Sequence, residues 1–331
     1  MKKYVFVLSM VLFSTILFIC WAPKPAMAGP IEFNLVSYTP KNSWIFETFE
    51  SQWIKKVNER AKGELIVKFR GGPETIPIFN QAEAVAKGSV DMALNGAGFY
   101  GKFIPGADMF RIPDMPSAQW RKDGTIEYLR ELHEAKGIYF SGPLPPDTKF
   151  LWITSRIPLR NREDMKGKRF ACSPAGLSFF KQMGATPMNM AVSEYYTALE
   201  RGVVDGNWIS IDSYVTSSLY EVAPYLIDHP FGNSTVDLII NLKKWTALPD
   251  HLKKLLNEVQ LETEANWPKL SAKAEAEYKG TASSKGAKFI QWSPEDAKWL
   301  HDLYAEATWE FYGKLYGPEI TQKFKQIWGV K

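Results

Sequence analysis

The sequence predicts an α/β protein built as two lobes, and three observations lead to that fold class. The chain after residue 28 begins strand, helix, strand, which is how an α/β layer starts. A helix–glycine–strand unit with one residue pattern occurs once in each half of the chain. Roughly 300 residues remain after residue 28, and that length exceeds what one hydrophobic core usually organises.

Residues 1–28 are predicted to be a cleaved signal peptide. A charged start is followed by an apolar stretch over residues 4–21 and by the small-residue cleavage site Ala26-Met-Ala28. We therefore expect export to the periplasm. Once the three lysines of this segment are removed, 37 basic residues remain beside 36 acidic ones, a net charge of +1. Such a balance offers no basic face for nucleic acid, so no nucleic-acid partner is expected.

The first lobe is predicted to start with a strand at residues 31–37, which alternate and are rich in β-formers. Residues 44–61 follow with helical spacing, and Gly63 ends that helix. A second strand is expected at residues 65–69. The repeated unit then appears as Ala84-Val-Ala-Lys-Gly-Ser-Val-Asp-Met92, in which a helix ends at a glycine and Val-Asp enters a strand.

The second lobe is predicted from a similar order of elements. Strands are expected near residues 150–154 and 168–172, a helix at residues 177–183, and a further helix starting at Ser193. The repeated unit returns as Ala198-Leu-Glu-Arg-Gly-Val-Val-Asp-Gly206. We therefore assign residues 151–231 to the second lobe, and residues 29–150 with about 232–331 to the first.

The C-terminal part is predicted to be mostly helical. A helical run from Leu248 to about Tyr278 far exceeds the average helix of about 11 residues, so it is expected to brace both lobes. A last helix is expected from a cap at Ser293 to Trp328.

The sequence contains no convincing catalytic or metal-binding motif. Its four histidines are scattered, Cys172 is the one cysteine left after residue 28, and no P-loop or nucleophile elbow occurs. Gly96-Ala-Gly-Phe-Tyr-Gly101 matches a dinucleotide fingerprint, but Pro105 interrupts the helix that such a site needs. The better interpretation is a glycine-rich loop at the end of a strand, facing a ligand crevice. We expect no enzyme, no cofactor and no metal ion.

In these residues the chain resembles the DctP-like family, the solute receptors of TRAP (tripartite ATP-independent periplasmic) transporters. The most specific match is Ser193-Glu-Tyr-Tyr-Thr-Ala-Leu-Glu-Arg-Gly-Val-Val-Asp-Gly206, with Asp164-Met-Lys-Gly-Lys168, Met183-Gly-Ala-Thr-Pro187 and Asn241-Leu-Lys-Lys-Trp245 in order around it. The resemblance covers essentially the whole mature chain. It implies a type II periplasmic-binding-protein fold, with a hinge, a long lobe-spanning helix and closure over a small ligand.

The sequence departs from the family where a ligand carboxylate is usually held. The resemblance places an arginine at the position of Ala171, and a second polar contact at the position of Ile209. Two explanations stay open. Another cation, with Arg169, Arg70 and Lys149 as candidates, meets the acid from a different side, or the main contacts are aromatic and neutral.

Further candidate ligand contacts come from loops that follow predicted strands. Trp208 matches a tryptophan of the family members that bind 2-oxo acids, whereas Asn207 replaces the acid near which those members can hold a metal ion. Asparagines in these loops would donate neutral hydrogen bonds, and aromatic rings would form pocket walls. The remaining candidates are Tyr38, Asn95, Phe99, Tyr100, Phe231 and Asn233.

Our functional hypothesis is a periplasmic receptor that captures a small organic acid with apolar or aromatic character. It would act as a monomer and deliver the solute to the membrane permease subunits of a TRAP-type transporter. Two alternatives stay open: the same receptor for a neutral or amine ligand, and a ligand sensor that reports to a signalling partner.

Overall fold

The computed structural model describes residues 29–112, 117–145 and 149–330. The chain divides into a short unit, Met1–Ile31, and a compact unit, Glu32–Lys331, which carries the features described below. The predicted signal peptide, residues 1–28, lies outside the described residues. Within the described ranges, no helix combines the length and the apolar character needed to cross a membrane.

The first sheet has five strands in the order β2–β1–β3–β10–β4. β1 and β3 are parallel, whereas β10 runs antiparallel to both β3 and β4. The strands are β1 (Ile31–Ser37), β2 (Leu65–Gly71), β3 (Met92–Gly96), β4 (Ile138–Leu144) and β10 (Val236–Asn241). A strand from late in the sequence therefore completes a sheet that is otherwise built from residues 31–144.

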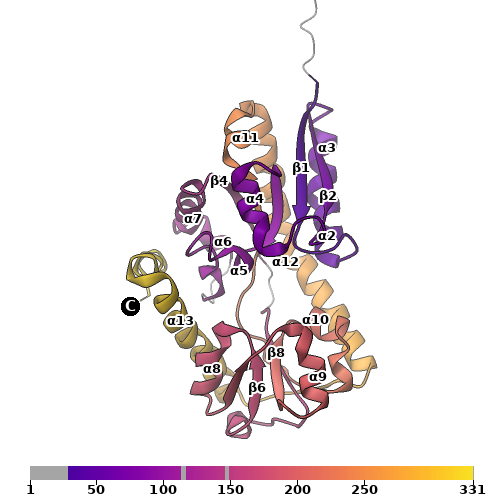
Figure 1. Ribbon diagram of the computed structural model, residues 1–331, viewed down its shortest axis with the longest axis vertical. Coiled ribbons are helices and arrows are strands. Elements are labelled where there is room, and N and C mark those ends of the chain that lie inside the picture. The colour runs from indigo at the N-terminus through magenta and orange to yellow at the C-terminus, as the bar shows by residue number, and fades with distance from the viewer. Residues whose placement is uncertain (1–28, 113–116, 146–148, 331) are drawn as a thin grey trace, which may run out of the picture. The chain divides into compact units, whose positions relative to one another are not determined.

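Short helices accompany the first sheet (Figure 1). The expected helix at residues 44–61 forms as two α-helical parts joined by a π-helical turn at Glu50–Ile54, and its start is capped by Ser43, whose hydroxyl accepts from the Phe46 amide at 3.2 Å. Gly88 ends the helix of the first repeated unit with φ 77°, a conformation that favours glycine. The helices are α2 (Trp44–Phe49), α3 (Lys55–Arg60), α4 (Gln81–Lys87), α5 (Ala97–Tyr100), α6 (Ser117–Trp120), α7 (Thr125–Glu134) and α11 (Leu242–Ala247).

The second sheet has six strands in the order β11–β9–β5–β8–β6–β7. β6 is parallel to both β7 and β8, and β5 is antiparallel to β8 and β9. The elements are β5 (Trp152–Ser155), β6 (Arg169–Cys172), α8 (Leu177–Gln182), β7 (Thr186–Asn189), α9 (Tyr195–Glu200), β8 (Gly206–Ile209), α10 (Ile211–Thr216), β9 (Tyr225–Ile227) and β11 (Lys288–Ile290).

Two segments of the chain pair with each other where the chain passes between the sheets. Leu151 precedes β5 and Phe231 follows β9, and their backbones form an antiparallel bridge with two N–H···O distances of 2.9 Å. Gly232 continues this crossing with φ 67°, and a Cβ there would lie 2.7 Å from the Tyr304 hydroxyl. The crossing therefore depends on glycine at this position.

Two long helices contact elements of both sheets. α12 (Asp250–Ser284) packs against β4 and α3 of the first sheet's layer and against α10 beside the second. α13 (Pro294–Trp328) starts at the predicted cap, Ser293, whose hydroxyl accepts from the Asp296 amide at 3.1 Å, and it is interrupted at Gly317. The expectation of one long helix that braces both halves matches α12.

The boundaries of the halves differ from the sequence-based assignment at the C-terminal end. Residues 232–331 were assigned to the first lobe, yet β11 pairs with β9 in the second sheet. Leu300 and Tyr304 in the first part of α13 pack into a core of the second sheet, whereas Tyr312 and Phe324 pack into the core of the first. Strand pairing and helix packing of this kind depend on tertiary contacts, which a local pattern does not encode.

Candidate functional site

A pocket of about 610 Å³, partly open to solvent, is formed by segments from both sheets and by one face of α12. Tyr38 comes from the end of β1, Thr235 from the start of β10, and Ser210 and Asp212 from the segment after β8. α12 contributes Trp267, Ser271, Ala274, Glu275 and Tyr278. These residues come from segments that are far apart in the sequence, so the fold brings them together around one cavity.

Strand ends position two of the polar side chains. Tyr38 directly follows β1, and Asp212 lies in the first turn of α10, just after β8. The carboxyl ends of β1 and β8 therefore lie at this pocket, and open α/β sheets usually bind ligands at that edge.

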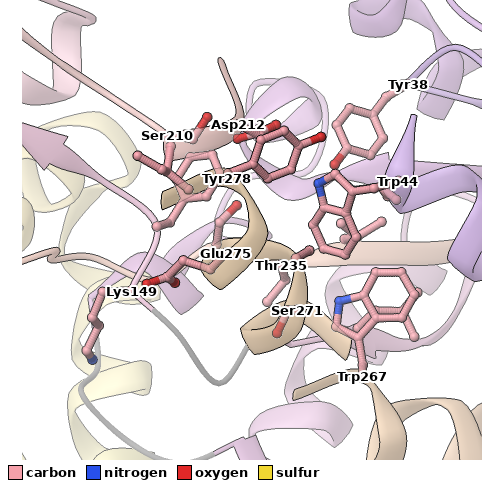
Figure 2. Close-up of a pocket in the computed structure, with 17 residues that line it drawn as sticks. Tyr38, Trp44, Lys149, Ser210, Asp212, Thr235, Trp267, Ser271, Glu275 and Tyr278 are labelled. Atoms are coloured by element: carbon pink, nitrogen blue, oxygen red, sulfur yellow. The ribbon is translucent and has the colours of Figure 1, made fainter. Parts of the chain in front are cut away.

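We call this cavity the aromatic pocket, because its lining includes the rings of Tyr38, Trp44, Trp267 and Tyr278. Figure 2 shows Tyr38, Trp44, Asp212 and Tyr278 gathered together, with Trp267 below them. The rings of Trp44 and Trp267 have centroids 5.9 Å apart. Burial, followed by the negative charge of Asp212, raises the pKa of the Tyr38 hydroxyl, and the same two causes raise the pKa of Tyr278. Both phenols therefore remain protonated hydrogen-bond donors beside a carboxylate.

The Asp212 carboxylate forms no hydrogen bond or ion pair with any residue in the described part of the chain. It is partly buried and is not used to cap α10. Glu275 supplies a second carboxyl group to the same lining. Among the described lining residues these two carboxylates and Lys149 are the charged groups.

Lys149 connects this pocket to a second cavity, which we call the basic hollow. Its volume is about 260 Å³, and its lining includes Arg111, Lys149, Asn233, His301 and Tyr304. In Figure 2 Lys149 lies across the view from Tyr38 and Trp44, with its amine directed away from the rings. That amine donates a hydrogen bond to Asn233 Oδ1 at 3.3 Å.

The electrostatics of the basic hollow favour an anion. Burial lowers the pKa of the Lys149 amine, and burial followed by the positive charge of Lys149 lowers the pKa of His301. An anionic group placed among these side chains would compensate both effects, because an opposite charge favours the protonated form.

The glycine-rich loop after β3 brings Arg111 to this hollow. A Cβ on Gly98 would lie 2.6 Å from Arg111 Nη2, and a Cβ on Gly101 would lie 2.9 Å from Asp108 Oδ1. Asp108 in turn accepts hydrogen bonds from the hydroxyls of Tyr312 at 2.9 Å and Tyr316 at 2.5 Å. The glycines of the apparent dinucleotide fingerprint thus make room for the side chains that position an arginine.

Two of the ten predicted ligand contacts lie in these linings, and a third touches one of them. Tyr38 lines the aromatic pocket and Asn233 lines the basic hollow. The Phe99 ring has its centroid 5.6 Å from that of Tyr38.

Asn95 and Tyr100 face the interior of the first sheet's layer. Asn95 donates to the Ile78 carbonyl at 3.1 Å and its Oδ1 accepts from the Gly96 amide. The Tyr100 hydroxyl lies 2.7 Å from Asp237 Oδ2 and 3.2 Å from His133 Nε2. Neither side chain lines the aromatic pocket or the basic hollow.

Trp208, Phe231 and Asn207 are buried in the second sheet's layer. Trp208 and Phe231 have ring centroids 6.2 Å apart and belong to one hydrophobic core that also includes Phe179. Asn207 accepts from the Thr154 hydroxyl at 2.6 Å, and its Nδ2 has no hydrogen-bond partner among the described residues. None of the three is among the residues that line the aromatic pocket or the basic hollow.

Ala171 and Arg169 lie outside both linings. Ala171 is fully buried in a hydrophobic core, whereas Arg169 is exposed at the start of β6 and pairs with Asp205, Nη2 to Oδ1, at 3.0 Å. Arg70, another candidate cation, donates to Asn34 Oδ1 at 2.6 Å on an exposed surface. Of the candidate cations, the structure brings Lys149 to the site. As ligand contacts, all ten positions stay predictions.

Several lining residues were missed by the sequence analysis. Those that carry polar or aromatic groups are Trp44, Arg111, Phe150, Ser210, Asp212, Ser234, Thr235, Trp267, Ser271, Glu275, Tyr278, His301 and Tyr304. Asp212 had a usable signal, because it lies a few residues after the predicted strand that begins at Val204-Asp205-Gly206. No group of three or more potential metal-ligating side chains occurs in the described ranges.

Comparison with known proteins identifies the family. Residues 35–314 match the family model DctP, bacterial extracellular solute-binding protein, family 7. The chain belongs to this family. The predicted resemblance is therefore confirmed, and the family is one of solute-binding receptors and not of enzymes.

Curated relatives of the same family share part of the sequence. The 2,3-diketo-L-gulonate-binding periplasmic protein YiaO of Escherichia coli K12 is 27% identical over 229 residues, which are 64% of this chain and 68% of that protein. The C4-dicarboxylate-binding periplasmic protein DctP of Vibrio cholerae is 23% identical over 280 residues, 81% of this chain and 82% of that protein.

A solved structure shows the same fold. The TRAP periplasmic solute-binding protein of Desulfovibrio salexigens, with bound orotic acid, superimposes with a TM-score of 0.76 at 22% identity, covering 90% of this chain and 98% of that one. The predicted two-lobed periplasmic-binding-protein fold is confirmed.

Proposed function

We propose that this DctP-family protein is the periplasmic receptor of a TRAP-type uptake system and that it captures a small organic acid. The ligand carboxylate would bind in the basic hollow, and its apolar part would lie against the rings of the aromatic pocket. The protein would be exported by its signal peptide, act as a monomer and deliver its solute to membrane permease subunits.

The observation that carries this proposal is the set of basic side chains around one hollow. Arg111, Lys149 and His301 line it together, although the position that usually holds the carboxylate arginine in the family is Ala171. A guanidinium can hold a carboxylate through two parallel hydrogen bonds, which a lone ammonium cannot do. Two relatives have names that specify acids as their ligands, which supports the same ligand class here.

Capture would proceed by closure of the two halves over the solute. The aromatic pocket and the basic hollow are lined by residues that precede or follow the Leu151–Phe231 crossing, including Lys149 and Asn233. A ligand that contacts both sides stabilises the closed form by the contacts that exist in that form alone.

A binding screen of purified residues 29–331 tests the proposal. Thermal shift would compare small carboxylic acids, aliphatic and aromatic, with their neutral carboxamides, because an amide keeps the shape and removes the charge. A ligand at about 100 times its dissociation constant stabilises the fold by roughly 2.7 kcal/mol, which gives a visible shift. We expect acids to shift the melting temperature and their amides to have little effect.

Two variants then locate the carboxylate. Arg111→Gln should weaken binding of the best acid by at least about tenfold, because a charge-assisted bidentate contact is lost. Arg169→Gln is the matched control on the exposed surface and should bind like wild type. The proposal is wrong if amides bind as well as acids, or if Arg169→Gln loses binding while Arg111→Gln, folded by circular dichroism, retains it.

A further inference from the structure

We propose that the solute is zwitterionic: besides its carboxylate it carries an ammonium or quaternary ammonium group, which binds at Asp212 in the aromatic pocket. This inference rests on the proposed function, because it adds a second charged group to the same ligand. Its basis is independent of the basic hollow and lies in the aromatic pocket alone.

Asp212 is a partly buried carboxylate in the first turn of α10, and it lines the same cavity as the rings of Tyr38 and Tyr278. It forms no ion pair or hydrogen bond within the described ranges, and Lys149 directs its amine toward Asn233. A cationic ligand group beside it would give this carboxylate an ion-pair partner.

The rings around Asp212 suit a cation in particular. Burial, and after it the charge of Asp212, raises the pKa of the Tyr38 and Tyr278 hydroxyls, and Trp44 lies beside Tyr38 in the same lining. Aromatic faces attract ammonium groups, and most strongly those that are weakly hydrated, such as trimethylammonium. A purely anionic ligand would instead be repelled by Asp212 and by Glu275, which lines the same pocket.

The two cavities divide the charges of the site. Arg111, Lys149 and His301 line the basic hollow, whereas both carboxylates of the two linings, Asp212 and Glu275, lie in the aromatic pocket. Lys149 lines both cavities, so the proposed zwitterion would extend past this side chain from one cavity to the other. Opposite charges at the two ends of a site fix the orientation of a zwitterion and exclude solutes that carry one charge.

Isosteric ligand pairs test this directly. The probes are trimethylammonio-acetate, -propanoate and -butanoate, each paired with the acid in which a carbon atom replaces the nitrogen, so that a tert-butyl group takes the same shape without the charge. Titration calorimetry would measure each pair on the wild-type protein. We expect at least one chain length at which the ammonium member binds about tenfold or more tightly than its tert-butyl counterpart.

The variant Asp212→Asn then tests whether Asp212 causes the preference for the ammonium member. The variant keeps the size of the side chain, and the preference for the ammonium member should fall to about threefold or less while the tert-butyl acid binds as before or better. Asp250→Asn is the control: it removes a carboxylate from the start of α12, about 25 Å of helix away from Trp267, and should keep the wild-type preference. A stability role of Asp212 alone would weaken both members of a pair equally.

The outcomes separate the two proposals. If carboxylic acids bind but tert-butyl members bind as tightly as ammonium members, the zwitterion inference is overturned and the acid receptor stands. The same holds if Asp212→Asn keeps the preference. If no carboxylate binds better than its amide, the proposed function is overturned, and this inference with it.

Discussion

Replacing Asp237 by asparagine should remove one of two opposing contributions to the pH dependence of the stability of the protein. Asp237 is fully buried in β10, and burial raises the pKa of its carboxyl group from 3.8 to about 7. Its Oδ2 lies 2.7 Å from the Tyr100 hydroxyl, which is also 3.2 Å from His133 Nε2. The Tyr100 hydroxyl donates to Asp237 Oδ2, which favours the ionised carboxylate, but burial has the larger effect and keeps the pKa of this carboxyl group raised.

The size of the effect follows from the two pKa values. The unfolded chain loses the Asp237 proton near pH 3.8 and the folded chain keeps it until about pH 7. A raised carboxyl pKa therefore contributes stability at low pH that is lost as the pH rises through 7. Between pH 5 and pH 8 this loss is roughly 2.5 kcal/mol for the wild-type protein, and Asp237→Asn should not show it.

Urea unfolding of wild type and Asp237→Asn at four pH values between 5 and 8 measures the difference. The comparison must be made between the two proteins, because His133, whose pKa burial lowers to about 4, gives a slope of opposite sign in both. Asp302→Asn, which changes a largely exposed carboxylate, is the control and should follow wild type. A difference between Asp237→Asn and wild type that stays constant from pH 5 to pH 8 would refute the reasoning.

Three further outcomes follow from the same structure. Arg169→Ala removes an exposed ion pair and should leave the urea midpoint close to that of wild type; a clear decrease would show that the pair is structural. Phe231→Ala leaves a cavity in an aromatic core and should cost about 3–5 kcal/mol, and a loss below about 1 kcal/mol would contradict the packing described for it. Acid binding should tighten as the pH falls below 7, because a bound anion favours protonated His301; calorimetry in buffers of different ionisation enthalpy would show proton uptake, and a pH-independent affinity would count against the basic hollow.

The elements of the fold were predictable because local patterns determine them. The strand at residues 31–37 and the helix starts at Trp44 and Ser293 lie where alternation and capping place them. The pairing of β11 with β9 was not predictable, because three residues at Lys288–Ile290 carry no sign of which sheet they join. The sheet that these three residues join depends on where the preceding helix, α12, ends.

The site was predictable only where its residues directly follow strands. Tyr38 was found in this way, and Asp212 could have been found by the same argument. Trp267 and Tyr278 were not, because helical spacing does not say which face of α12 covers a cavity and which covers a core. Arg111 lies in an irregular segment, and its place in the hollow depends on a glycine at position 98 that leaves it room.

α12 has a consequence for how solute preference can diverge among descendants of one receptor gene. Five residues of the pocket lining lie along this helix between Trp267 and Tyr278, where the helix is held by its own backbone hydrogen bonds. Substitutions at polar positions of this helix, such as Ser271 and Glu275, can change which solute the pocket binds without altering the sheets or the chain crossing. A duplicated gene can therefore acquire a new solute through a few codon changes in one short stretch, while the rest of its sequence remains under selection for folding and closure.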